Sequence, residues 1–189
     1  FNYMALIVCA RARDYAEITF HKFADELEAK DAAGQYAFGA PENEKHRVTW
    51  EGIAVWTYLG ATFKGLKNQG AVMTGSAYPG LWSLVYTPGD LESMAEAYTN
   101  VYINTCGPNR YEEFYKVVKN SKSDGIVLHL NRSCKLMGLL NNEGAEYVNA
   151  KLGVPYVSFD GDQTDPRVFT PAQYETRVQA LTEMMDENQ

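Results

Sequence analysis

Residues 126–134 read IVLHLNRSC, a short apolar run followed at once by polar residues. The run has the length and character of a strand buried on both faces. A helical pattern over residues 135–152 begins directly after it, which is typical of a βαβ unit. The same alternation recurs, with strands expected at 47–56, 71–74 and 155–159 and helices at 59–68, 91–104, 110–120 and 171–187. It predicts an α/β fold, a Rossmann-like parallel sheet of about four strands with helices on both faces.

The N-terminal part of the chain has a different pattern. Residues 14–30 have the apolar spacing of an amphipathic helix, with Phe20, Phe23, Ala24 and Leu27 on one face. The stretch GQYAFGAPENEK at 34–45 is rich in turn-forming residues. We therefore expect a helical segment at 1–34, a linker at 35–46 and the α/β domain at 47–189. Since the chain starts inside an apolar stretch without an initiator methionine, we expect it to be a processed or truncated piece of a longer protein.

The composition excludes several classes of function. Of the 189 residues, 46% are hydrophobic and 22% are charged, as in an ordinary globular protein. The 17 basic and 24 acidic residues give a net charge of −7, which disfavours nucleic acids and anionic membranes as partners. No apolar run reaches the roughly 20 residues that span a bilayer, and no signal peptide is evident, so we expect a cytoplasmic protein. Three widely spaced cysteines indicate neither a disulfide framework nor a self-contained zinc site.

Polar residues gather just after the expected strands. In an open parallel sheet, ligands bind beyond the carboxyl ends of the strands, so these positions are candidates for a site. Cys134 lies at a strand-to-helix junction, where the helix dipole favours a thiolate that can bind iron or zinc or attack an electrophile. The alternative is a buried structural cysteine.

The loop after the last strand is rich in carboxylates, with Asp160, Asp162 and Asp165. The spacing of the first two resembles the first motif of haloacid-dehalogenase-type phosphohydrolases, with Asp160 as nucleophile and Asp162 as acid/base. In that family, however, the motif follows the first strand, and here only one helix comes after it. The alternative is a loop in which carboxylates cap backbone N–H groups and pair with Arg167. Dinucleotide, P-loop and serine-hydrolase motifs are missing.

Several residues are expected to be structural. Asp90 and Thr170 precede helical patterns as N-caps, and Gly153 ends one. Leu91 and Tyr98 belong to the inward stripe expected for the helix at 91–104. The three tryptophans, Trp50, Trp56 and Trp82, are expected in the core. Of the histidines, His129 is expected to be hydrogen-bonded within the sheet, and His21 and His46 are expected on the surface.

Four stretches together resemble a known family: DGIV at 124–127, NRSCK at 131–135, GVPYVSFDGDQTDPR at 153–167 and QYETRVQAL at 173–181. They are similar to the C-terminal half of the 2-hydroxyacyl-CoA dehydratase subunits, the 2-hydroxyglutaryl-CoA dehydratase D-component, and of the related benzoyl-CoA reductase subunits. The resemblance extends through residues 50–56 and 73–82, and so covers nearly everything after the linker.

The resemblance implies an oxygen-sensitive, two-subunit iron–sulfur enzyme. Each subunit would have Rossmann-like domains and a [4Fe–4S] cluster held by three cysteines, and a separate ATP-dependent iron–sulfur activator would inject one electron. The reaction would eliminate water from an (R)-2-hydroxyacyl-CoA through a ketyl radical to give a 2-enoyl-CoA. There are two alternatives to a dehydratase subunit. The chain could belong to a benzoyl-CoA reductase subunit, or it could be a non-catalytic module that docks a partner subunit.

The resemblance also assigns site residues. Cys134 matches the C-terminal cluster cysteine of the family, whereas the other ligands are expected in an N-terminal domain without a counterpart here, so the isolated chain is expected to be inactive. Glu51 is a candidate proton acceptor. The residues expected around the cluster or the acyl group are Asn131, Arg132, Ser133, Ser76 and Trp50.

Overall fold

A computed structural model describes residues 8–10, 13–82 and 84–188, and the chain divides into two compact units, Phe1–Lys45 and His46–Gln189. The smaller unit contains helix α2 (Asp14–Ala32) and a 3-10 turn, η1 (Pro41–Asn43). The expected helix is therefore present, but within α2 only Ala16 is buried, and Leu27 of the apolar stripe is 67% exposed. Residues 1–7, 11 and 12 of the expected helical segment lie outside the described residues.

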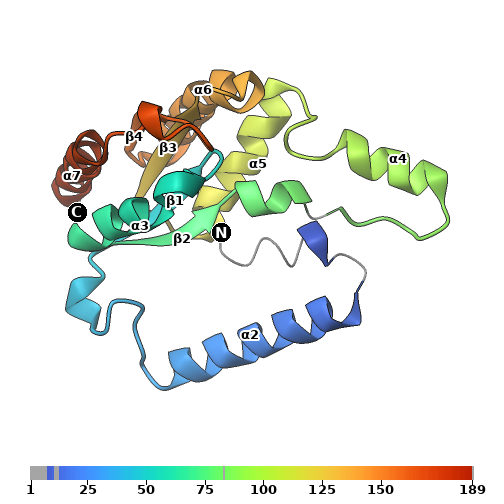
Figure 1. Cartoon of the computed structure of the whole chain (residues 1–189), viewed down its shortest axis with the longest axis horizontal. Coiled ribbons are helices and arrows are strands. Elements are labelled where there is room, and N and C mark those ends of the chain that lie inside the picture. Colours follow the sequence, from blue (N-terminus) through green and yellow to red (C-terminus); the bar gives the residue numbers. More distant parts are fainter. Residues whose placement is uncertain (1–7, 11–12, 83, 189) are drawn as a thin grey trace. The chain divides into compact units, whose positions relative to one another are not determined.

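The larger unit is built on a four-stranded parallel sheet (Figure 1). Its strands are β1 (His46–Glu51), β2 (Ala71–Ser76), β3 (Gly125–Asn131) and β4 (Tyr156–Gly161), in the order β2-β1-β3-β4. The predicted fold class is confirmed. Among the described residues no helix is long and apolar enough to cross a membrane.

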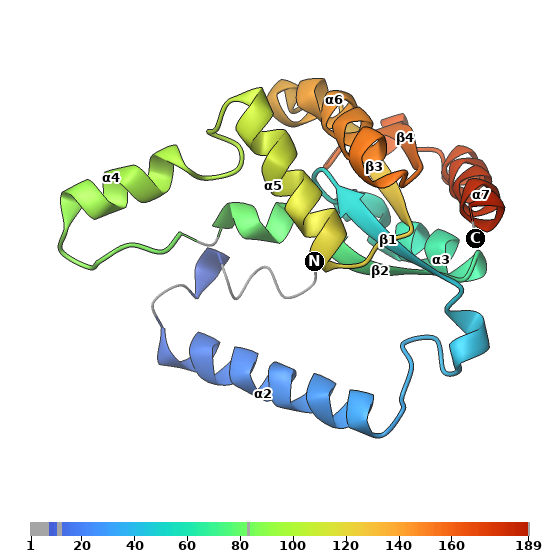
Figure 2. The same ribbon diagram turned by 180° about the vertical axis from the view of Figure 1, so that it is seen from behind.

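Helices cover both faces of the sheet, as the views from the two sides show (Figures 1 and 2). On one face α3 (Leu59–Asn68) packs beside α7 (Pro171–Glu187), and on the other α5 (Gly107–Asn120) packs beside α6 (Lys135–Leu152). The helix α4 (Leu91–Thr99) stands away from the sheet. Short 3-10 turns occur at η2 (Trp56–Tyr58), η3 (Tyr78–Trp82) and η4 (Pro166–Val168).

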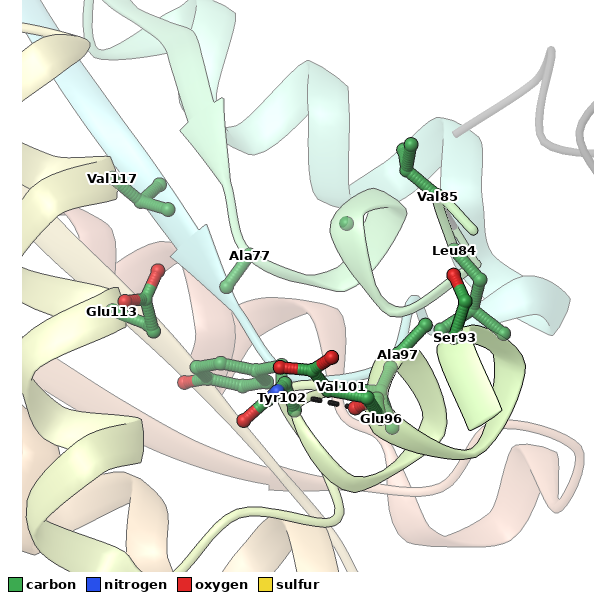
Figure 3. A pocket seen from close by; sticks show the side chains of 12 residues that line it. Ala77, Leu84, Val85, Ser93, Glu96, Ala97, Val101, Tyr102, Glu113 and Val117 are labelled. Carbon is green, nitrogen blue, oxygen red and sulfur yellow. Dashed lines mark hydrogen bonds between the residues drawn. The ribbon is translucent and has the colours of Figure 1, made fainter. Parts of the chain in front are cut away.

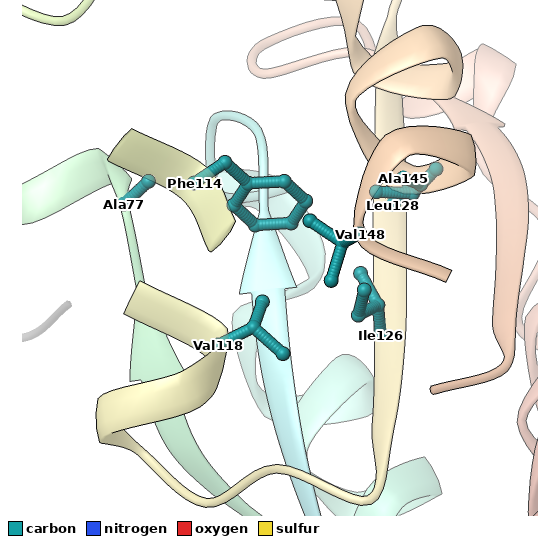
Figure 4. Close-up of a cluster of buried hydrophobic side chains, with 7 residues drawn as sticks. All are labelled: Ala77, Phe114, Val118, Ile126, Leu128, Ala145 and Val148. Carbon is teal, nitrogen blue, oxygen red and sulfur yellow. The ribbon is translucent and has the colours of Figure 1, made fainter. Parts of the chain in front are cut away.

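Each face of the sheet has its own apolar core. Between the sheet and α5 and α6 lies a cluster of seven residues, Ala77, Phe114, Val118, Ile126, Leu128, Ala145 and Val148 (Figure 4). On the α3 and α7 face, Trp50 and Tyr174 contact the ring of Phe159, with centroid distances of 5.5 and 4.8 Å. Full burial of a large apolar side chain contributes about 1.5–3 kcal/mol, so these two clusters hold the layers together.

The first strand is shorter than predicted. It ends at Glu51 because Gly52 adopts a φ of +101°, which turns the chain out of the sheet. A Cβ atom at Gly52 would lie 2.5 Å from the carbonyl oxygen of His129, so only glycine fits there. Trp56 consequently lies outside the sheet and is 40% exposed, and the expectation that it is a core residue is wrong.

Some of the other local predictions are confirmed, and others are wrong. Asp90 caps α4 by accepting hydrogen bonds from the backbone of the first turn, and Gly153 ends α6 with a φ of +70°. Thr170, by contrast, makes no side-chain cap. The inward stripe of α4 was also predicted wrongly, since no α4 residue is buried. His46, expected on the surface, is only 2% exposed, and its Nε2 atom lies 3.1 Å from the carboxylate of Asp186.

Candidate functional site

The strand order creates a switch point between β1 and β3. From β1 the chain crosses by α3 to β2 on one side, and from β3 it crosses by α6 to β4 on the other. Because the two crossovers diverge, the carboxyl ends of β1 and β3 are the place where an open α/β sheet binds ligands. Glu51 is the last residue of β1 and Asn131 is the last residue of β3.

Glu51 is buried on the α5 and α6 side of this point, with 1% exposure. Its Oε1 atom accepts a 2.8 Å hydrogen bond from the Tyr102 hydroxyl and lies 3.7 Å from Nη2 of Arg110. Burial raises the pKa of the Glu51 carboxyl, and the Tyr102 hydrogen bond, the Arg110 charge and the backbone N–H of Gly52 oppose that rise. Its Oε2 atom accepts no hydrogen bond of normal geometry from the described residues.

Tyr102 joins the buried carboxylate to an open pocket. Its ring lines a pocket of about 470 Å³ between α4, η3 and α5, with the carboxylates of Glu96 and Glu113 on the same walls (Figure 3). Burial and the neighbouring Glu51 charge raise the pKa of Tyr102, so its hydroxyl stays protonated. Tyr102 is therefore a hydrogen-bonding group between this pocket and Glu51.

Arg110, in the first turn of α5, was not predicted from the sequence. It is 1% exposed and donates hydrogen bonds to the Leu136 carbonyl (3.0 Å) and to Oδ1 of Asn141 (2.9 Å), both in α6. The guanidinium also lies 4.7 Å from the centre of the Tyr102 ring. A signal was present in the sequence, since Arg110 stands four residues before Phe114 on the inward stripe of α5, where a charged residue is unusual.

Cys134 is the N-cap residue of α6 and is half-buried, at the junction that the sequence predicts. Its backbone N–H donates to the Asn131 carbonyl (3.2 Å), and its own carbonyl accepts from Gly138 N–H (3.0 Å). Tyr78, in the turn after β2, lies close enough that a Cys134 thiolate contributes to its raised pKa, after the larger effect of burial. The turn after β2 therefore lies near this cysteine.

Asn131 organises the loop that leads to Cys134. Its Oδ1 atom accepts hydrogen bonds from the backbone N–H groups of Ser133 and Gln163, each at 3.3 Å, and so ties the loops after β3 and β4 together. Its Nδ2 atom is a buried donor without a hydrogen-bond partner among the described residues. Arg132 is exposed beside it and lies 3.6 Å from the carboxylate of Asp160.

The acidic loop is held by its own hydrogen bonds. Asp162 is 3% exposed and accepts from the Ser133 hydroxyl and from the backbone N–H groups of Thr164 and Asp165, the latter two at 2.9 Å. These bonds, with Ser133 first, keep the pKa of Asp162 well below its usual range. Arg167 pairs with Asp165 at 2.7 Å. The geometry matches the capping alternative rather than a nucleophile and its acid.

The other two residues expected at the site, Trp50 and Ser76, make hydrogen bonds within their own turns. Trp50 is 2% exposed on the α3 and α7 face, and its Nε1 atom donates to the Gly52 carbonyl (3.1 Å), which helps to fix the turn after Glu51. The Ser76 hydroxyl, at the end of β2, accepts from the backbone N–H of Tyr78 (3.3 Å). The structure thus brings Asn131, Ser133 and Cys134 into one loop and places Glu51 in a separate buried cluster.

Potential metal ligands are sparse in the part of the chain that the structure describes. Within the described ranges there is no group of three or more His, Cys, Asp or Glu side chains that could hold a metal ion. The cysteines at positions 9, 106 and 134 are all free, and Cys134 is the one at the switch-point edge of the sheet. A single thiol does not hold an iron–sulfur cluster, so the described residues fit one ligand of such a group and not the whole set.

These features define an open parallel α/β domain with a polar site at its topological switch point. A family model described as "2-hydroxyglutaryl-CoA dehydratase, D-component" matches residues 1–185, and the chain belongs to this family. The resemblance seen in the sequence is confirmed.

Named relatives agree with this membership. Lactoyl-CoA dehydratase subunit alpha of Anaerotignum propionicum is 60% identical over 190 residues, covering 100% of this chain and 44% of that protein. The (R)-2-hydroxyisocaproyl-CoA dehydratase alpha subunit of Clostridioides difficile is 42% identical over 187 residues, covering 99% and 45%. The chain thus spans less than half the length of these relatives.

A reductase is a more distant relative. One of the benzoyl-CoA reductase subunits of Thauera aromatica is 26% identical over 155 residues, covering 79% of this chain and 36% of that protein. The two dehydratase subunits are more similar to this chain, in both identity and coverage.

Proposed function

We propose that this chain is part of the alpha subunit of a 2-hydroxyacyl-CoA dehydratase, a lyase that removes water from an (R)-2-hydroxyacyl-CoA to give a 2-enoyl-CoA. The observation that carries the proposal is the 60% identity to a lactoyl-CoA dehydratase alpha subunit over the whole chain. (R)-Lactoyl-CoA is accordingly the first substrate to test. In this reaction, one electron on the thioester carbonyl gives a ketyl radical anion, hydroxide leaves the α-carbon, a base removes the β-proton, and the electron is then returned.

We infer that Cys134 supplies one thiolate ligand of a [4Fe–4S] cluster, with the remaining ligands outside this chain. Such a cluster, when bound, supplies one-electron transfer and a Lewis-acidic iron. Two features of the chain support this role. Cys134 is half-buried as the N-cap residue of α6, and Asn131 Nδ2 is a buried donor without a partner among the described groups. An N–H donor on the ligand's own loop could stabilise the negative charge on sulfur.

The other residues of the loop would serve the substrate and the loop itself. Ser133 holds the loop through Asp162, and the exposed guanidinium of Arg132 is available to the acyl-CoA. Ser76 would line the same edge of the sheet from the end of β2. Trp50 would act through Gly52, whose turn it fixes from the opposite face.

We propose Glu51 as the proton acceptor. Burial raises its pKa, which makes its carboxylate a stronger base than an exposed one. Since Glu51 is 1% exposed, a proton would reach it through Tyr102, which lines the pocket and donates to Oε1. The hydroxyl would give its proton to Glu51 and take another from the pocket side, so that it ends unchanged.

We also infer the partners. The relatives are named alpha subunits, which supports a heterodimer with a homologous second subunit. An ATP-dependent iron–sulfur activator would supply the electron, in an anaerobic cytoplasm. The net charge of −7 supports neither nucleic acid nor an anionic membrane as a partner.

The test is a turnover assay under anaerobic conditions. The protein is expressed with all of the sequence that its gene encodes, together with its second subunit and activator, and is offered (R)-lactoyl-CoA or benzoyl-CoA. Formation of acryloyl-CoA supports the dehydratase. Reduction of benzoyl-CoA without dehydration supports the reductase alternative, and turnover of neither would leave the docking module as the better account.

A further inference from the structure

We propose that Arg110 is a positioning residue, which fixes the first turns of α6 and thereby the location of Cys134. The inference deepens the proposed function, and it rests on that function only for what Cys134 binds. Its support is the place of the guanidinium in the fold and the groups that the guanidinium contacts.

The side chain of Arg110 reaches the first turns of α6. Nη1 donates to the Leu136 carbonyl at 3.0 Å, two residues after the N-cap Cys134, and Nη2 donates to Asn141 Oδ1 at 2.9 Å in the second turn. Nη2 also lies 3.4 Å from the sulfur of Met137. All three contacts fall within the first seven residues of α6, at the end that carries Cys134.

Two groups outside α6 hold the guanidinium in place. Glu51 lies 3.7 Å from Nη2, and the Tyr102 ring lies 4.7 Å from the guanidinium carbon. Glu51 ends β1, whereas Tyr102 belongs to the segment between α4 and α5. Arg110 therefore connects the carboxyl end of β1 to the cysteine-bearing end of α6.

Burial makes a charged residue at this position costly. A buried guanidinium loses its hydration, and a buried ion pair is often no more stabilising than an apolar pair of the same size. Its neighbours on the α5 stripe, Phe114 and Val118, are apolar and 1% exposed. An apolar residue at position 110 would therefore be enough if this position served only to pack the core. An apolar residue could not donate hydrogen bonds to a helix carbonyl and to an amide oxygen at the same time, as the planar guanidinium does.

The proposal predicts local loosening in Arg110→Ala. The experiment uses the protein expressed with all the sequence of its gene, in the apo form, and measures amide hydrogen exchange and the alkylation rate of Cys134 by iodoacetamide. We expect exchange in residues 136–141 and alkylation of Cys134, normalised to the exposed Cys9, to rise by about fivefold or more. Millimolar guanidinium chloride should fill the vacated site and reverse both changes, whereas sodium chloride at equal ionic strength should not.

Tyr174→Phe is the matched control. It removes a buried hydrogen bond, from the Tyr174 hydroxyl to the Thr62 carbonyl at 3.0 Å, on the opposite face of the sheet. It should loosen α3 and α7 while leaving residues 136–141 and Cys134 unchanged. Arg110→Lys, which keeps the charge but loses the planar group, should give an effect between wild type and Arg110→Ala, and serves if the alanine variant fails to fold.

The readouts separate this inference from the proposed function. Unchanged exchange and alkylation in Arg110→Lys and Arg110→Ala, or a uniform rise over the whole domain without guanidinium rescue, would overturn the positioning role. Neither readout requires a bound cluster. A Cys134→Ser protein that retains its full iron content would refute the ligand assignment and leave the result for Arg110 standing.

Discussion

The Tyr102 hydroxyl donates a 2.8 Å hydrogen bond to Oε1 of Glu51, across 51 positions of the chain. The bond brings a half-buried side chain of an irregular segment to the buried end of the first strand. Because Tyr102 also lines the pocket beside α4, its side chain links the buried Glu51 carboxylate to solvent-accessible space.

Removing this hydrogen bond should destabilise the domain. In Tyr102→Phe, Glu51 keeps its burial but loses the donor to Oε1, and we expect the free energy of unfolding to fall by about 1–3 kcal/mol. Urea denaturation followed by circular dichroism measures the change. Tyr98→Phe is the control, since Tyr98 is 49% exposed, and it should stay within about 0.5 kcal/mol of wild type. Equal stability of the two variants would contradict the importance of the bond.

Glu51 should make the stability of the domain depend on pH. Its pKa is raised on folding, so the folded state binds more protons than the unfolded state between the unfolded value of 4.5 and the folded value. Stability that is present below pH 4.5 is therefore lost as the pH rises through the folded pKa.

Glu51→Gln should lack this decline, although it leaves the Arg110 charge unpaired and lowers the overall stability. The measurement is the free energy of unfolding from pH 4 to pH 8, in urea, for wild type and variant. The difference between them should shrink as the pH rises. A constant difference would show that Glu51 titrates normally.

Asp162 should have the opposite dependence. Its pKa is lowered by the Ser133 hydroxyl and by two backbone N–H groups, so its contribution is present above the unfolded value of 3.8 and is lost as the pH falls through the folded pKa. Asp162→Asn should cost about 1.5–3 kcal/mol at pH 7, with a smaller cost in acid. Asp160→Asn, at a side chain that is 61% exposed, is the control and should change little. If both variants behave alike at pH 7, Asp162 does not hold the loop.

Gly52 should not tolerate a side chain. Its φ of +101° and the 2.5 Å approach of a Cβ atom to the His129 carbonyl predict that Gly52→Ala loses about 2 kcal/mol or more. Gly60→Ala, in the exposed part of α3 with open space around its Cβ position, should be neutral or slightly stabilising. Thermal unfolding of the two proteins gives the comparison, and a stable Gly52→Ala would mean that the turn relaxes at little cost.

Local sequence patterns were sufficient for much of the fold. Apolar runs and capping residues located all four strands of the sheet and the α3 and α6 boundaries, because these depend on neighbouring residues. The end of β1 was missed because it depends on a contact between Gly52 and His129, which are remote in the sequence. His46 was misplaced for the same reason, since its partner Asp186 comes from the last helix.

The same distinction between local pattern and remote contact applies to the candidate site. Cys134 and Asn131 stand at a strand-to-helix junction, a position that the sequence itself marks. Arg110 and Tyr102 reach Glu51 only through the packing of α5 and the segment before it against the sheet. A helix pattern shows that residue 110 faces inward but does not show which carboxylate or carbonyl it meets.

The most direct test of the central claim is the iron content of Cys134→Ser. The protein is expressed with all the sequence of its gene, reconstituted anaerobically with iron and sulfide, and compared with wild type and with Cys106→Ser, a substitution of an exposed cysteine at the start of α5. We predict that Cys134→Ser loses its [4Fe–4S] spectrum and most of its iron, while Cys106→Ser retains both. A full cluster in Cys134→Ser would contradict the assignment of Cys134 as a ligand.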